Sequence, residues 1–223
     1  MQVLVTGALG QLGSELVPAL RERYGTDAVV VTDVRSPGDD VLAAGPFHVL
    51  DATDGNTLLA LVRRYRISRI YHLAALLSAT AEGQPLHAWE LNMSALISVL
   101  EVARQEGCSV FTPSSIGAFG PNTPKDFTPQ DTLQQPTSMY GITKVAGELL
   151  CNYYYRRYNV DTRGVRYPGI ISNRTLPGGG TTDYAVDIYY AAVRDGRYTC
   201  FLKGDTYLDM IYMPDAVRAA IDI

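Results

Sequence analysis

The stretch Gln2-Val3-Leu4-Val5-Thr6-Gly7-Ala8-Leu9-Gly10-Gln11-Leu12-Gly13 joins a short apolar run to three regularly spaced glycines. The β-branched residues at its start predict a buried parallel strand. Leu12, Leu16 and Leu20 then follow with helical spacing. Strand, glycine turn and helix in this order bring backbone N–H groups toward a pyrophosphate at the helix N-terminus. An ordinary strand-to-helix turn is the alternative that the glycines alone leave open.

The glycine spacing is G-x-x-G-x-x-G rather than G-x-G-x-x-G. The candidates for contact with a dinucleotide in this turn are Gly7, Leu9, Gly10, Gln11, Leu12 and Gly13.

The next expected strand, residues 28–32, ends at Asp33, twenty residues after Gly13. A carboxylate at this place can accept both ribose hydroxyls and repels a 2′-phosphate, which favours NAD over NADP. Arg35 lies close enough in sequence to keep NADP open.

Strand and helix patterns continue to alternate along the chain. A third strand at 47–50 leads into Asp51 and Ala52, where a side chain could reach the adenine. A helix at 57–65 precedes a fourth strand, which ends in small residues that allow close approach of a cofactor. These residues are Leu73, Ala74 and Ala75. This alternation predicts an α/β fold with a doubly wound parallel sheet.

Two polar residues follow the fourth strand. Ser78 lies at the sheet edge where such folds bind ligands, although a loop serine there needs no function. Asn92 interrupts the apolar side of a long helix expected from Pro85 to Glu106. It is either a hydrogen-bonded core amide or part of a proton path.

The candidate catalytic stretch is Ser138-Met139-Tyr140-Gly141-Ile142-Thr143-Lys144. Tyr140 and Lys144 are four residues apart and so share one face of a helix. A tyrosine with a pKa near ~10 is a poor base at neutral pH, and an ammonium one turn away favours the phenolate. The pair is therefore a candidate general base, and chance spacing is the alternative.

A fifth strand at 109–112 runs into Pro113-Ser114-Ser115, followed by a long proline-containing loop that we expect to be functional. Ser115 precedes Tyr140 by 25 residues. A serine at the carboxyl edge of this strand can face a tyrosine on the next helix.

Together these motifs resemble the extended short-chain dehydrogenase/reductase family, close to the sugar-nucleotide epimerases. The resemblance rests on Thr6-Gly7-x-x-Gly10-x-x-Gly13, Asp33, His72-Leu73-Ala74-Ala75, Ser114-Ser115-x-x-x-Phe119-Gly120 and Tyr140-x-x-x-Lys144. It implies a Rossmann fold, NAD as the cofactor, and Ser115, Tyr140 and Lys144 as the catalytic group. Phe119 departs from most sugar-nucleotide members, which have tyrosine there.

A second resemblance narrows the group within this family. The runs Arg166-Tyr167-Pro168-Gly169-Ile170-Ile171-Ser172 and Gly178-Gly179-Gly180-Thr181-Thr182-Asp183-Tyr184-Ala185-Val186 are similar to the short-chain type of L-threonine 3-dehydrogenase. This implies NAD-dependent oxidation of the 3-hydroxyl of L-threonine to 2-amino-3-oxobutanoate. A sugar-nucleotide epimerase or dehydratase, and a non-catalytic dinucleotide-binding module, are the alternatives.

The resemblance also assigns further roles. Cofactor contacts are implied for Asn92, Tyr140, Lys144, Tyr167 and Ile170, and substrate contacts for Ser78, Ser115, Tyr140, Thr181, Thr182 and Asp183. A helix N-terminus at Thr181 and Thr182 could hold a carboxylate, and Asp183 an ammonium. In the family two helices like the one carrying Tyr140 pair across a dimer, so a homodimer is expected.

We expect residues 1–167 to form the NAD-binding domain with the catalytic residues. Residues 168–223 would form the beginning of a small substrate-binding lobe mixed with the last Rossmann elements. Because family members continue further and no stop signal ends the last helix, the chain is expected to be truncated.

Composition excludes several other classes. The chain has 223 residues, a net charge of −4 and scattered arginines, so neither a nucleic-acid face nor a membrane segment is expected. Cys108, Cys151 and Cys200 are odd in number and lack C-x-x-C spacing, which indicates reduced core or near-core thiols of a cytoplasmic protein. The three histidines show no metal-ligand spacing, so no metal is expected.

Overall fold

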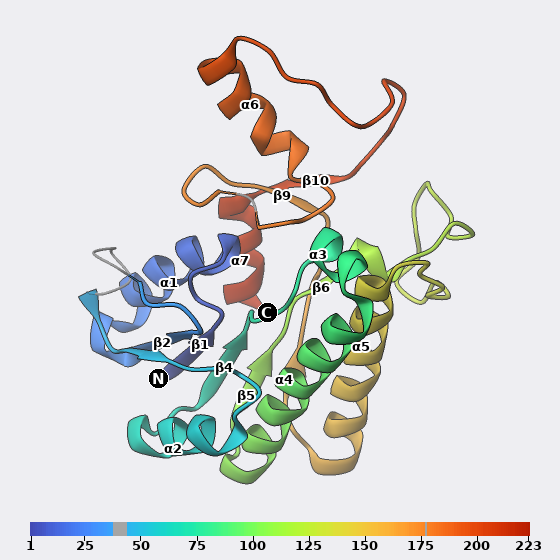
Figure 1. Ribbon diagram of the computed structural model, residues 1–223. Coiled ribbons are helices and arrows are strands. Elements are labelled where there is room, and N and C mark those ends of the chain that lie inside the picture. Colours follow the sequence, from blue (N-terminus) through green and yellow to red (C-terminus); the bar gives the residue numbers. More distant parts are fainter. Residues whose placement is uncertain (38–43, 177) are drawn as a thin grey trace.

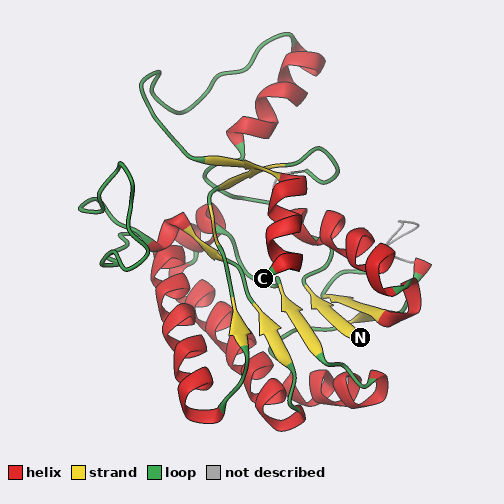
Figure 2. Cartoon of the chain, turned by 180° about the vertical axis from the view of Figure 1, so that it is seen from behind, coloured by secondary structure: helices red, strands yellow, loops and turns green. Residues whose placement is uncertain are grey.

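The computed structural model describes residues 1–37, 44–176 and 178–223, and its centre is a six-stranded sheet (Figures 1 and 2). The strands are β1 (Val3–Thr6), β2 (Val29–Asp33), β3 (Phe47–Val49), β4 (Arg69–His72), β5 (Ser109–Phe111) and β7 (Thr162–Arg163). Their order is β3-β2-β1-β4-β5-β7, and all neighbours are parallel. The chain therefore changes direction across the sheet between β1 and β4, which confirms the doubly wound fold.

Helices cover both faces of this sheet. On one face, α1 (Gln11–Tyr24) packs against α7 (Met213–Asp222). On the other face, α4 (Pro85–Glu106) lies between α2 (Gly55–Tyr65) and α5 (Met139–Tyr158). The expected span of the long helix that carries Asn92 is confirmed.

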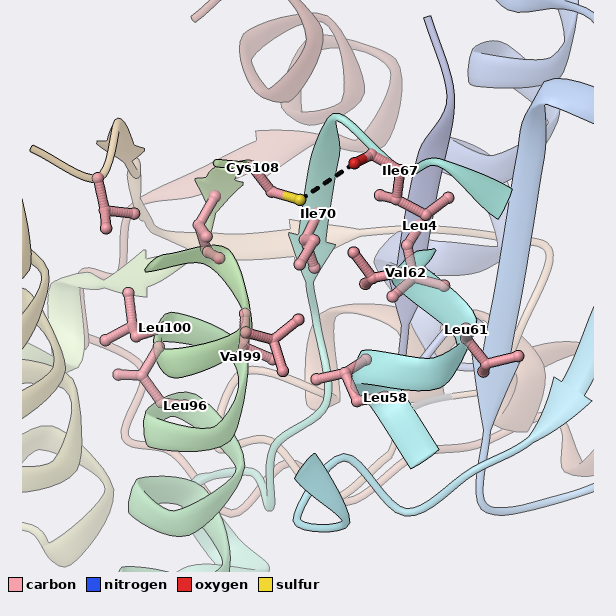
Figure 3. Close-up of a cluster of buried hydrophobic side chains, with 14 of the residues drawn as sticks. Leu4, Leu58, Leu61, Val62, Ile67, Ile70, Leu96, Val99, Leu100 and Cys108 are labelled. Atoms are coloured by element: carbon pink, nitrogen blue, oxygen red, sulfur yellow. Dashed lines mark hydrogen bonds between the residues drawn. The ribbon is translucent and has the colours of Figure 1, made fainter. Parts of the chain in front are cut away.

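The alternation of side chains along β1 divides the core in two. Val3 and Val5 join the cluster under α1 and α7, whereas Leu4 faces the cluster under α2 and α4. Figure 3 shows the second cluster, where Ile70 and Leu100 are fully buried. Apolar side chains on both faces of a strand are what a buried parallel sheet requires.

The cysteines match the expectation only in part. Cys108 is buried, its Sγ donates to Ile67 O at 3.1 Å, and burial raises its pKa to about 11 (Figure 3). Cys151 is half-buried, but Cys200 is exposed. The prediction of a core or near-core thiol is thus wrong for Cys200, which lies between α6 (Tyr184–Asp195) and β10 (Met210–Tyr212).

The expected sixth strand, residues 160–167, is divided into β7 and β8 (Arg166–Tyr167). The latter pairs in parallel with β6 (Ser114–Ser115) rather than with the central sheet. The break falls at Gly164 and Val165, opposite Pro113, and backbone bonds continue across it, because Thr112 N donates to Arg163 O and Ser114 N donates to Val165 O, both at 2.9 Å.

The remaining elements lie at the carboxyl edge of the sheet. A short helix, α3 (Ser78–Gly83), follows β4, and β9 (Gly169–Ile171) pairs in parallel with β10 (Met210–Tyr212). Between these two strands, α6 (Tyr184–Asp195) extends away from the sheet (Figure 1). The last helix, α7, returns to α1, so part of the range 168–223 packs in the same core as β1.

None of the helices in the described ranges has the length and apolar character needed to cross a membrane.

Candidate active site

The glycine turn after β1 packs directly against the segment after β4. Gly7 has φ +67, and a Cβ there would lie 2.6 Å from Ala74 Cα. Glycine is the residue that tolerates both this conformation and this approach. Leu73 N donates to Thr6 O at 3.0 Å. Two segments predicted to contact the cofactor are therefore in contact with each other.

The start of α1 has the features of a pyrophosphate site. A Cβ at Gly10 would meet Gly7 O at 3.4 Å and no other atom within 4 Å, so space is open beside the turn. Gln11 Nε2 is buried and has no hydrogen-bond partner among the described residues. A buried donor without an acceptor is expected where a ligand supplies one. These residues fit the phosphate groups of NAD.

Asp33 lies at the end of β2, close to the glycine turn. Its Oδ2 accepts from Leu9 N at 3.0 Å, and its Oδ1 accepts from Arg35 N and Nε at 3.1 and 3.2 Å. With two acceptor positions on each carboxylate oxygen, Oδ2 keeps one for a ribose hydroxyl, whereas both positions on Oδ1 are taken by Arg35. Asp51, predicted near the adenine, is exposed and accepts from Thr53 N at 2.9 Å, beside the buried Ala52.

Two acceptors fix the start of α5, where Tyr140 is the second residue. Ser138 Oγ accepts from Gly141 N at 3.1 Å, which is an N-cap bond. Glu82 Oε1, from α3, accepts from Met139 N at 2.6 Å. The helix that carries the candidate base is thereby tied to the helix that begins at Ser78.

Ser115 and Tyr140 both border Gly117. A Cβ at Gly117 would lie 3.4 Å from Ser115 Oγ and 3.4 Å from Tyr140 Cδ1. Ser115 Oγ accepts from Gly117 N at 3.0 Å, which fixes the hydroxyl. A Cβ at Gly141 would lie 2.1 Å from Gly117 O, so only glycine lets α5 approach this closely. The predicted serine and tyrosine are thus brought together.

Lys144 completes the group one turn along α5. Its Nζ lies 5.3 Å from the centroid of the Tyr140 ring and donates to Pro113 O at 2.7 Å. An ammonium has three N–H bonds, and in the described part of the chain Pro113 is its one hydrogen-bond acceptor. The others are available to Tyr140 and to a ribose.

Lys144 also lines a cavity of about 620 Å³ between the sheet and helices α4 and α5. The predicted cofactor residues that share this cavity are Leu73, Ala74, Ala75 and Asn92. Neither the glycine turn nor Ser115 and Tyr140 line it. The predicted cofactor residues therefore do not all line one cavity: those after β4 line it, and those of the glycine turn do not.

His72, at the end of β4, lies in the same cavity. Its Nδ1 is 2.9 Å from Thr6 Oγ1, and it is buried. Burial, with a smaller effect of the Lys144 charge, lowers the pKa of His72 to about 3. The ring is therefore neutral near pH 7.

Asn92 and Tyr167 each use their polar groups on the backbone. Asn92 Oδ1 accepts from Leu76 N at 2.8 Å and Nδ2 donates to Leu76 O at 3.2 Å, which supports the structural alternative. Tyr167 Oη donates to Ala216 O at 2.6 Å, and burial raises its pKa. The hydroxyl of Tyr167 thus binds α7, whereas Ile170 on β9 packs at the edge of the same core.

The predicted substrate residues lie on two facing segments. Ser78 Oγ accepts from Thr181 N at 3.0 Å, and a Cβ at Gly169 would lie 2.8 Å from Thr182 Cβ. Asp183 Oδ2 accepts from Gly179 N at 2.9 Å and from Gly180 N at 2.7 Å. Burial raises the pKa of Asp183, although these two N–H groups act against the rise. Pro177 lies outside the described residues.

Sequence reasoning missed Glu82 and Glu148 as residues that support the site. Glu148 lies one turn beyond Lys144 on α5 and pairs with Arg166 of β8 at 2.7 Å. The spacing Tyr140, Lys144, Glu148 continues one helix face and was a usable signal for Glu148. No comparable signal marks Glu82, because its partner is 57 residues away.

Comparison with known proteins identifies the family of this chain. A model of the NAD dependent epimerase/dehydratase family matches residues 3–222. The chain belongs to this family. NAD is accordingly its cofactor, as the glycine turn and Asp33 indicated.

Several proteins of this family are similar to the chain over its whole length, and some of those with solved structures are named as L-threonine dehydrogenases. An uncharacterized epimerase/dehydratase of Staphylococcus aureus is 57% identical over 223 residues, which is 100% of this chain and 70% of that protein. A partial consensus L-threonine 3-dehydrogenase has a TM-score of 0.96 and 55% identity, over 100% of this chain and 71% of that one. The holo form of a GalE-like L-threonine dehydrogenase from Cupriavidus necator has a TM-score of 0.95 and 54% identity, over 100% and 72%.

Two further structures mark the range of the family. A UDP-glucose 4-epimerase from Thermotoga maritima with UDP-glucose has a TM-score of 0.90 but 26% identity, over 99% of this chain and 72% of that one. A monomeric L-threonine 3-dehydrogenase from a metagenome database has a TM-score of 0.95 and 44% identity, over 99% and 71%. Similar folds thus accompany different substrates.

Proposed function

We propose that this enzyme is an NAD-dependent L-threonine 3-dehydrogenase that oxidises the 3-hydroxyl of L-threonine to 2-amino-3-oxobutanoate. The observation that carries the proposal is sequence identity: threonine dehydrogenases of known structure are 42–55% identical to the chain, against 26% for the UDP-glucose epimerase. The arrangement of Ser115, Tyr140 and Lys144 supports a hydroxyl oxidation at this site.

In the proposed reaction, Tyr140 removes the hydroxyl proton of threonine as general base. When bound, NAD accepts the hydride that leaves C3. Ser115 Oγ donates to the reacting oxygen and fixes its place beside Tyr140. Lys144, already fixed by Pro113 O, holds Tyr140 and the nicotinamide ribose. The substrate loses the hydroxyl proton and the hydride of C3, and the loss of these two hydrogens converts the alcohol into the amino ketone product.

The carboxylate and ammonium groups of the substrate would be bound by the loop formed by residues 178–183. Thr181 and Thr182, just before α6, would bind its carboxylate through the Thr182 N–H and the threonine hydroxyls, because Thr181 N already donates to Ser78 Oγ. Asp183 would bind its ammonium. The contact of Ser78 Oγ with Thr181 N supports a role for both segments in one substrate pocket.

The same catalytic group would also serve a sugar-nucleotide epimerase, and the family name and the Thermotoga maritima structure favour this second candidate. Assays that supply L-threonine or a UDP-sugar separately, with NADH absorbance and sugar product both followed, separate the two. NADH formation with threonine alone is expected. Sugar product without threonine turnover would contradict the dehydrogenase.

Cofactor preference gives an independent check on Asp33. Asp33→Ser removes the carboxylate that repels a 2′-phosphate and frees the Arg35 side chain, which now pairs with Asp33 at 3.2 Å. We expect the preference for NAD over NADP to fall, measured as the ratio of the two kcat/KM values. An unchanged ratio would argue against the ribose contact.

We also propose that the protein acts as a homodimer in the cytoplasm. Apolar side chains are exposed on the outer faces of α4 and α5, among them Trp89, Ile97, Leu149 and Tyr153. Such a face suits self-association, although one similar threonine dehydrogenase is described as monomeric. Light scattering after gel filtration tests the state. Free cysteines, one of them exposed, suit a reducing compartment.

A further inference from the structure

A hydrogen-bonded carboxylate lies one helical turn beyond Lys144. Glu148 accepts from Arg166 Nε at 2.9 Å and Nη2 at 2.7 Å, and from Gln134 Nε2 at 3.0 Å. Its Oε1 also accepts from Ser114 Oγ. Both partners of the ion pair are largely shielded, with side chains 20% and 22% exposed for Arg166 and Glu148.

Arg166 is itself held in place by two other contacts. Its Nη1 donates to Gln130 O at 3.0 Å, and its guanidinium lies 5.1 Å from the centroid of the Phe119 ring. The pair therefore connects β8, α5 and the long loop after Ser115. Burial alone would raise the pKa of Glu148, but the bonds from Arg166, Ser114 and Gln134 lower it below its ordinary value. Glu148 is thus an anion at neutral pH.

This anion lies on the same helix as the catalytic lysine, four residues further along the chain. Lys144 binds the carbonyl of Pro113, and Glu148 binds the hydroxyl of the next residue, Ser114. Both side chains line the same cavity. Burial raises the pKa of Cys151 in that cavity to about 12, and the charges of Glu148 and Lys144 act on this thiol in opposite directions. Residues four apart on a helix form ion pairs readily.

An unpaired Glu148 would have few other cations to bind. The third cationic side chain of the cavity, Arg163, is engaged with Asp161 through Nε at 2.9 Å and Nη2 at 3.0 Å. Lys144 has two N–H bonds without a protein acceptor in the described residues. Loss of Arg166 would therefore leave the carboxylate and the ammonium to pair with each other.

We propose that Arg166 is a positioning residue that binds Glu148 and so prevents this carboxylate from pairing with Lys144. Lys144 then remains available to Tyr140 and the nicotinamide ribose. The role assigned to Lys144 rests on the proposed function, but its contact with the cofactor depends only on NAD binding.

Three variants test this inference: Arg166→Gln, Glu148→Gln and the double variant. Arg166→Gln should weaken NAD binding and lower kcat/KM by roughly tenfold, because coupled buried charges interact at this scale. Glu148→Gln should affect NAD affinity and kcat/KM much less, because it removes the competing carboxylate as well as the ion pair with Arg166. The double variant should recover most of the loss. Arg104→Gln, which breaks the 2.8 Å pair with Glu101 on α4, is the matched control.

The readouts distinguish positioning from a purely structural role. The dissociation constant for NAD is measured by isothermal titration calorimetry, and thermal midpoints are recorded at the same pH. A structural role predicts that both single variants lose NAD affinity in proportion to their loss of thermal stability. Equal losses in the two single variants, or no recovery in the double variant, would overturn the proposal. If the unmodified enzyme binds NAD but does not oxidise threonine, the proposed function fails while the NAD comparison still decides this inference.

Discussion

The first turn of α5 and the loop at residues 178–183 both bond to α3, but they are held in different ways. The turn is held by Ser138, by Glu82 of α3 and by close packing on Gly117. The loop is held mainly by its own residues, through Asp183 and the N–H groups of two glycines. Its link outward runs through the exposed helix α3.

This difference separates chemistry from substrate choice. The N-cap bond, the bond to Glu82 and the packing on Gly117 fix the catalytic group before any ligand binds, which lowers the cost of orienting the reacting groups. The loop can change its sequence without disturbing the sheet, as expected for segments that set specificity. The comparison therefore predicts large effects on turnover at α5 and smaller effects on KM at the loop.

The largest effect is expected at Tyr140. Tyr140→Phe removes the hydroxyl that acts as base and keeps the ring that borders Gly117. Turnover should fall by about 10²–10⁴-fold, the usual contribution of a general base. NAD affinity and thermal midpoint should stay nearly unchanged. Tyr155→Phe, at an exposed tyrosine of the same helix, is the control. An active Tyr140→Phe enzyme would refute the assigned role.

Close packing of α5 gives the next prediction. A Cβ at Gly141 would lie 2.1 Å from Gly117 O and 2.6 Å from Pro136 Cβ. Because a backbone oxygen must move, Gly141→Ala should destabilise the protein by about 1–3 kcal/mol and lower turnover. Urea unfolding and steady-state kinetics measure both effects.

Gly83→Ala is the matched control for Gly141→Ala. No atom lies within 4 Å of a Cβ at Gly83, the last residue of α3. This change should have little effect or stabilise by about 0.4–1 kcal/mol, because alanine restricts the unfolded chain. Similar behaviour of the two variants would show that the close approach of α5 does not position the site.

Local motifs could be predicted from the sequence, but contacts between distant segments could not. The glycine turn, Asp33 and the helix at 85–106 follow from local patterns, because strand, turn and helix signals lie within a few residues. The split of the sixth strand falls where Gly164 passes close to Thr112, whose O would lie 2.5 Å from a Cβ at Gly164, and these two residues are far apart in the sequence. The contact between Glu82 and Met139 joins residues 57 apart and depends on how α3 meets α5. Such contacts have no sequence pattern of their own.

Acid should destabilise the fold through His72. Its pKa is about 3 in the folded protein, against an ordinary value of 6.5, so only the unfolded chain takes up a proton near pH 5. The stabilisation is therefore present above pH 6.5 and is lost as the pH falls. It amounts to about 2 kcal/mol between pH 7 and pH 5.

His72→Asn should reduce this pH dependence, because asparagine cannot take up the proton and can still bond Thr6 Oγ1. Urea unfolding at the two pH values measures the change. His87→Gln, at an exposed histidine of α4, is the control. An unaltered slope in His72→Asn would assign the acid sensitivity to other groups.

The smallest effect is expected on the loop side. Ser78→Ala removes the oxygen that accepts from Thr181 N at 3.0 Å and leaves α5 untouched. If the loop binds threonine, KM should rise by about two- to tenfold, the usual range for one hydrogen bond. The value of kcat should hold, because an interaction equal in ground and transition states affects KM alone. Ser98→Ala, whose hydroxyl donates to Thr53 O at 3.1 Å on the far side of α4, is the matched control. A fall in kcat with KM unchanged would join Ser78 to the catalytic group and remove the distinction between the two regions.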